Sequence, residues 1–318
     1  MAALGTKKVD QFSFNIQLDT VPEDRGYHAR NKPGEIQRPD ILDDLCQGLL
    51  VQSRVDRIIH GTETKNGSPA TLIVFGFRFH GLSKKRRFRE AVINILFQDE
   101  NKNEDVDPVL STLWPNGDFT LGDPTPISKE HGGGTEVGAN AGSDYAGANV
   151  KRTWEKRKNY NVIDRARLTG SIILDPRVRN SGPPNTVSLT LSEDVTAESG
   201  LVTDLRAAVL LRRRNDANRF TAMVTVDAKA HFSYNIIKAT RDVFGCSPAN
   251  DPILFEPSPE NQYIRTATLE PYLEERLAEK VDVHNLNKNK LNNLAGVLGT
   301  TALATDKPES AEAPASEI

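Results

Sequence analysis

The chain has 318 residues, of which 37% are hydrophobic and 26% are charged, and its formal net charge is −3. This composition is ordinary for a globular protein with some unstructured ends, and it excludes a strong overall field that would steer a charged partner. Cys46 and Cys246 are too few for a disulfide framework, which favours a reducing compartment. The sequence shows neither a signal peptide nor the roughly 18 consecutive apolar residues of a transmembrane helix, so we expect a cytoplasmic protein.

The first fifty residues are predicted to contain one strand and one helix. Residues 1–10 are expected to be disordered. Apolar and polar residues alternate over residues 11–18, which is typical of a half-buried strand. Asp40 can cap a helix, and the apolar residues after it recur at helical spacing, so a short helix is predicted near residues 41–50.

The strongest strand pattern lies at residues 54–98. Two alternating segments flank Asn66-Gly67, a dipeptide that suits a tight hairpin turn because both positions tolerate positive φ. In the second segment the phenylalanines share one face, whereas Leu72 and Val74 lie on the other, which indicates burial on both sides. A third alternating segment, 88–98, leads us to predict an antiparallel meander of three strands.

Strands are also predicted at residues 118–121 and within residues 148–228, of which residues 205–228 are expected to form a hairpin. Helical spacing returns near residues 234–244 and 270–281.

Together these elements predict a mainly β protein with two packed antiparallel sheets, a sandwich or jelly-roll-like body, and a few short flanking helices. We expect one β-rich domain at residues 11–285. Residues 286–318 are rich in Asn and Lys and then in Ala, Pro, Ser and Glu, and we predict a disordered acidic tail there.

No pattern in the sequence indicates catalysis, a metal site or a cofactor. None of the six histidines has a metal-binding spacing, and the hairpin register does not place His60 opposite His80. The Gly-rich segment 132–149 lacks the pattern of a phosphate-binding loop and precedes a predicted strand, so we interpret it as a mobile surface loop. We therefore predict no metal and no cofactor, and we assign no catalytic residue.

Basic clusters are the most function-like feature of the sequence. Their cationic groups could neutralise phosphates, but basic residues on the outer face of a sheet or in hairpin loops also prevent edge pairing, and both interpretations stay open. The candidate anion-binding residues are Lys84, Lys85, Arg86 and Arg87; Lys156, Arg157 and Lys158; and Arg212, Arg213 and Arg214.

The second half of the chain carries a set of strand and turn sequences: Pro184–Leu191, Asp204–Arg213, Phe220–Val226 and Phe244–Pro257, together with Trp154-Glu155-Lys156 running toward Gly170-Ser171-Ile172. Over these segments the chain resembles a family of cytosolic proteins of filamentous fungi that has no known function. The resemblance implies a fungal, intracellular origin and supplies no activity, cofactor or site residue.

Three functions are compatible with these observations. The first is a non-enzymatic intracellular β-sandwich that binds an unknown partner. The second is a protein that binds an anionic surface, either phospholipid or nucleic acid, through the basic loops. The third is an enzyme whose site is assembled from separate strands, because such a site leaves no local motif. The oligomeric state is not predicted.

Overall fold

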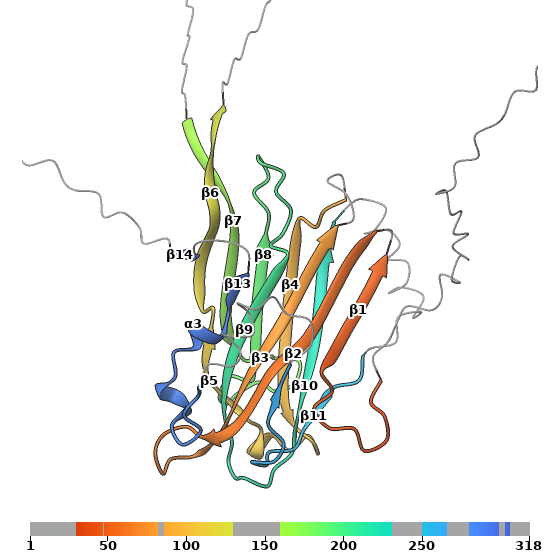
Figure 1. Cartoon of the computed structure of the whole chain (residues 1–318), viewed down its shortest axis with the longest axis vertical. Helices are drawn as coiled ribbons and strands as arrows, with labels where there is room; N and C mark the ends of the chain where they lie inside the picture. The colour runs from red at the N-terminus through yellow and green to blue at the C-terminus, as the bar shows by residue number, and fades with distance from the viewer. Residues whose placement is uncertain are drawn as a thin grey trace, which may run out of the picture.

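The computed structural model describes residues 30–46, 48–81, 86–129, 160–230, 250–265, 280–298 and 303–305. These residues form two antiparallel sheets of seven strands each, packed face to face (Figure 1). The predicted fold class, mainly β with two packed antiparallel sheets, is therefore confirmed.

The first sheet has the order β1 (Asp40–Cys46), β2 (Leu49–Thr62), β3 (Pro69–Gly81), β9 (Asp204–Arg212) and β13 (Gly296–Leu298), with β12 (Tyr263–Ile264) also paired to β2 and β5 (Val109–Trp114) also paired to β9. The second sheet has the order β11 (Ile253–Phe255), β10 (Phe220–Lys229), β4 (Glu90–Asp99), β8 (Thr186–Ser192), β7 (Tyr160–Ile173), β6 (Gly117–Lys129) and β14 (Leu303–Thr305).

Helical structure in the described residues is limited to the 3₁₀ turns η1 (Glu104–Val106) and η2 (Leu286–Lys288) and the four-residue helix α3 (Leu291–Leu294). Each spans about one turn. None of the helices in this part of the chain therefore has the length and hydrophobicity needed to cross a membrane.

The main core lies between the two sheets. Every second residue of β3 and β4 points into it, and the rings of Phe75 and Phe97 meet there from opposite sheets at a centroid distance of 6.2 Å. The first sheet is also buried on its outer side, where Leu72, Val74 and Leu210 belong to a second apolar cluster. This confirms the two-sided burial predicted for the strand after Asn66-Gly67.

The hairpin of β2 and β3 forms as predicted, with a loop at residues 63–68. Asn66 has a φ of 61°, and the Gly67 amide donates to the Thr64 carbonyl at 2.8 Å. In this register His60 lies opposite Thr71, and His80 lies opposite Leu50, so the two histidines are apart as expected.

The helix predicted near residues 41–50 is wrong. Residues 40–46 form β1, Gly48 turns the chain with a φ of 76°, and Cys46 pairs with Leu49 at the start of β2. The apolar spacing is compatible with a helix as well as a strand. Pairing with β2 favours the strand, because the backbone groups along the edge of β2 gain hydrogen bonds from a neighbouring strand.

The predicted meander and the predicted hairpin at residues 205–228 are also wrong in their pairing, although their strands exist. β4 pairs with β8 and β10 in the second sheet and not with β3. Likewise β9 lies in the first sheet and β10 in the second. Alternation shows which face of a strand is buried, but in a sandwich either sheet can bury that face, so neighbours in sequence need not pair.

Disorder from residue 286 onward is wrong for residues 286–298 and 303–305, which form η2, α3, β13 and β14. Several other predictions lie outside the described residues: the strand at 11–18, the helix near 234–244, residues 270–279 of the helix predicted near 270–281, the loop at 132–149, and the disorder of residues 1–10. Residues 280 and 281, the predicted end of that last helix, are not helical.

Candidate anion-binding pocket

The candidate site lies on a segment, residues 280–295, that packs on the outer face of the first sheet. Leu286, Leu291 and Leu294 insert into the outer apolar cluster together with Leu72 and Val74. Full burial of a leucine side chain contributes about 2 kcal/mol, so these three residues hold the segment firmly on the sheet.

Backbone hydrogen bonds fix the same segment to the end of β2. The Thr62 amide donates to the Val283 carbonyl at 2.9 Å, and the Asn287 amide donates to the Glu63 carbonyl at 2.9 Å. Gly61 permits this approach, since a Cβ atom there would lie 2.0 Å from the Val283 oxygen. The segment is thus a fixed part of the sheet surface.

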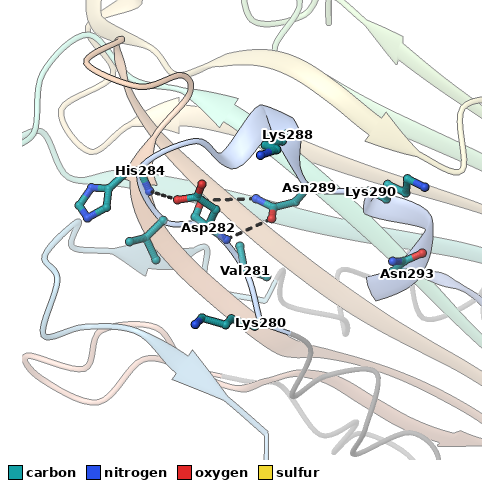
Figure 2. A pocket seen from close by; sticks show the side chains of 9 residues that line it. Lys280, Val281, Asp282, His284, Lys288, Asn289, Lys290 and Asn293 are labelled. Carbon is teal, nitrogen blue, oxygen red and sulfur yellow. Dashed lines mark hydrogen bonds between the residues drawn. The ribbon is translucent and has the colours of Figure 1, made fainter.

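Short polar side chains shape residues 282–289 into a compact loop (Figure 2). The His284 amide donates to the Asp282 carboxylate at 3.1 Å, and the Asp282 amide donates to the Asn289 side-chain oxygen at 3.1 Å. The Asn289 amide group also donates to the Leu286 carbonyl at 3.0 Å. Asp and Asn commonly form such local bonds, and here they give the loop a defined backbone without regular structure.

A pocket of about 730 Å³ opens beside this loop. Lys280, Lys288 and Lys290 lie on different sides of it in Figure 2, and all three side chains are exposed. None of the three forms an ion pair within the described residues. The rest of the described lining is Val281, Asp282, Val283, His284, Asn289 and Asn293.

The charges of this lining favour anions. The described lining contains three lysines and one carboxylate, and Asp282 already accepts a backbone hydrogen bond. A single exposed lysine contributes at most about 1 kcal/mol to binding an anion, and salt weakens it, so affinity here depends on several lysines acting on one ligand.

The pocket contains a histidine and a carboxylate, but they do not form a catalytic pair. The Asp282 carboxylate accepts from the main-chain amide of His284, and the imidazole ring points away from it in Figure 2. General acid–base chemistry needs the ring nitrogen itself within hydrogen-bond reach of its partner. The described lining thus offers cations and amide groups, which suit the binding of an anion.

Arg86 and Arg87, from the first predicted basic cluster, line a second cavity of about 570 Å³. Arg87 is neutralised there, with its Nε 2.7 Å from Glu193 and its Nη1 3.4 Å from Glu198. The hydrogen bond with Glu193 raises the pKa of Arg87 above its usual value. Arg86 is exposed. Lys84 and Lys85 lie outside the described residues.

Arg212, Arg213 and Arg214 have three different environments. Arg212 is exposed, whereas Arg213 is buried and donates to the carbonyls of Asn215 and Asp216 at 3.2 Å. Burial lowers the pKa of Arg213, although Asp216 partly offsets this. Arg214 donates to the Asp105 carbonyl. Arg213 therefore fixes the turn after β9. Lys156, Arg157 and Lys158 lie outside the described residues.

The two described clusters lie at opposite ends of the first sheet. Arg212 is opposite Ala70 at the start of β3, and Arg86 follows Gly81 at the end of that strand. At about 3.3 Å per residue, these ends are roughly 35 Å apart. The structure therefore does not bring them together, and an anion-binding role for either cluster stays a prediction.

Sequence analysis missed the lysine pocket because its residues fall in a region read as helix and then disordered tail. Leu286, Leu291 and Leu294 are the available signal, since apolar residues recurring beside Asp and Asn turn residues indicate a packed loop. The low overall hydrophobicity of residues 280–295 concealed that signal.

No group of three or more His, Cys, Asp or Glu side chains suited to a metal ion occurs within the described ranges. Comparison with protein-family models, with curated proteins and with solved structures found no match.

Proposed function

We propose that the protein is a non-enzymatic binding protein whose partner presents phosphate groups to the lysine pocket of residues 280–293. The observation that carries this proposal is that Lys280, Lys288 and Lys290 all line one pocket of about 730 Å³. The two-sheet body supplies a rigid support, because leucines and backbone hydrogen bonds fix the pocket to the first sheet.

The pocket supports this function better than the predicted basic loops do. Arg87 and Arg213 already have acidic or carbonyl partners, so an anion would have to compete with them. The three pocket lysines have no ion-pair partner within the described residues. A ligand phosphate could therefore approach them without breaking an existing pair.

Binding of a fluorescent single-stranded RNA and of anionic phospholipid vesicles tests the proposal and separates the two sources of phosphate. Each probe is titrated at about 50 mM and about 200 mM salt against the wild type and the Lys280→Ala/Lys288→Ala/Lys290→Ala variant. If three lysines contact RNA phosphates, the slope of log affinity against log salt should become shallower by about 2 in the variant.

A matched variant, Arg30→Ala/Lys32→Ala/Lys102→Ala, removes the same charge from exposed residues outside the pocket. We expect it to keep most of the affinity. Equal losses in both variants, or no binding of either probe at low salt, would contradict the proposal. Hydrolysis of a phosphate probe that disappears with Lys288→Ala would contradict the non-enzymatic part.

A further inference from the structure

A buried ionic network occupies the outer face of the first sheet, on three adjacent strands. Arg54 of β2, Gly76 of β3 and Arg206 of β9 lie opposite one another in the sheet. A β-bulge after Val55 places Asp56 over Gly76. The Asp56 carboxylate accepts from the Nε of Arg54 at 2.9 Å and from the Nε of Arg206 at 2.8 Å.

The network continues through a second carboxylate. Asp204 accepts from Arg54 and from Arg78, each at 2.8 Å. Burial alone would lower the pKa of Arg54, but the two aspartates outweigh this effect and raise it. The ion pairs are therefore strong enough to keep charges on this face despite burial.

Among the described members of the network, Arg206 has two nitrogens without a hydrogen-bond partner, and Arg265 has one, its Nε. The Arg206 side chain is 1% exposed, yet neither its Nη1 nor its Nη2 has a hydrogen-bond partner within the described residues. A buried, unpaired donor is destabilising by about 1–3 kcal/mol, and more when it is charged. Native proteins rarely leave such groups without a partner, water or ion.

The charges of the described network indicate which kind of partner the free edge of Arg206 favours. Among the described residues, the network has one more cation than anion: Arg54, Arg78, Arg206 and Arg265 against Asp40, Asp56 and Asp204. Water could accept a hydrogen bond from Arg206 but would leave the excess charge. A guanidinium edge with two free nitrogens matches two oxygens of an oxyanion, or one small halide.

We propose that the unpaired guanidinium edge of Arg206 binds a small inorganic anion, phosphate or chloride, which completes this buried network. The site is separate from the lysine pocket and does not depend on the proposed function. It would make the stability of the fold depend on anion concentration, because an anion that binds only the folded state stabilises it by mass action.

The thermal unfolding midpoint tests the site at constant ionic strength, with sodium phosphate or chloride replacing gluconate at millimolar concentration. A tenfold excess of anion over its dissociation constant should raise the wild-type midpoint by about 3 °C or more. Arg206→Lys should lose this rise, because an ammonium group lacks the two-pronged edge. No rise when phosphate or chloride replaces gluconate, or an equal rise in Arg206→Lys, would overturn the proposal.

Two controls identify the source of the effect. Arg179→Lys alters another buried arginine, whose Nη1 and Nη2 are already paired with Asp107 and the Pro183 carbonyl, so the anion effect should persist. Lys102→Ala changes an exposed lysine outside both the network and the lysine pocket and should also keep it. If Arg206→Lys does not fold, wild-type crystals grown in bromide decide: anomalous density beside both Nη atoms supports the site, and water alone or nothing there refutes it.

Discussion

Arg206 of β9 and Asp56 of β2 form an ion pair of 2.8 Å in which the two side chains are 1% and 0% exposed. The pair spans the width of β3, which lies between their strands. Such burial is tolerable only when the hydrogen bonds of both groups are satisfied, because removing charges from water costs several kcal/mol per ion. The stability of this pair therefore depends more on hydrogen bonds with neighbouring groups than on the attraction between its two charges.

Asp56→Asn should be strongly destabilising. The amide removes the charge that Arg54 and Arg206 share, and breaking a buried pair typically costs about 3–5 kcal/mol. Urea unfolding monitored by fluorescence measures the change. Asp43→Asn, at an exposed position of β1, removes the same charge and should change stability by about 0.5 kcal/mol or less. Similar values for the two variants would show that the network contributes little.

Gly76→Ala should disrupt the same network through sterics. A Cβ atom there would lie 2.7 Å from an Asp56 oxygen and 2.8 Å from the Arg54 guanidinium carbon. We expect a loss of about 2–3 kcal/mol in unfolding free energy. Gly34→Ala is the comparison, since its φ of 75° strains alanine but the added methyl meets no atom within 4 Å, so about 1 kcal/mol is expected. A smaller loss at Gly76 than at Gly34 would contradict the packing argument.

Acid should destabilise the fold through His60. Its Nε2 accepts from the Gln37 amide at 2.8 Å, so Nδ1 carries the proton and donates to Thr71 at 2.9 Å. Burial, aided by Arg213, lowers the pKa of His60 to about 4. The unfolded chain therefore binds this proton first, and stability falls as pH drops from about 6.5 to about 4, by roughly 3 kcal/mol in total.

Urea unfolding across this pH window measures the effect. His60→Asn removes the titrating group, so its stability should vary less between these pH values than that of the wild type. His80→Gln changes an exposed histidine and should keep the wild-type slope. An unchanged slope in His60→Asn would assign the acid sensitivity to other groups.

Leu286→Ala should loosen the lysine pocket without touching its charges. Leu286 is fully buried in the outer apolar cluster, and truncation of such a leucine costs about 2–5 kcal/mol. Hydrogen exchange should quicken at the amides of Thr62 and Asn287, which join β2 to the pocket segment. The affinity for RNA or for vesicles should fall in the same variant. Full affinity in a loosened variant would mean that the ligand binds elsewhere.

The predicted basic loop offers a direct comparison with the pocket. If the pocket is the main site, Lys84→Ala/Lys85→Ala/Arg86→Ala/Arg87→Ala should reduce phosphate binding less than the triple pocket variant. It should also lower stability, because Arg87 is bonded to the buried Glu193. Binding and urea unfolding are measured together. A larger binding loss in the loop variant would favour the loop as the anion site.

Sequence patterns identify the strands and their buried faces well, as the phenylalanines of β3 illustrate. They do not identify the sheet to which a strand belongs, because β4 and β10 would bury the same side chains in either sheet. They also do not reveal the ionic network, whose members Asp56 and Arg206 are far apart in sequence and look like ordinary exposed residues. Only pairing around Gly76 brings them together.

The positions of β13 and β14 have a consequence for how the protein is made. β13 adds to β9 of the first sheet and β14 to β6 of the second, although the two strands are only a few residues apart in the chain. During translation each sheet keeps an unpaired edge strand until residues 296–305 have left the ribosome. At about 5–20 residues per second, several seconds pass between the emergence of β9 and that of β13. During this time a chaperone can protect those edges.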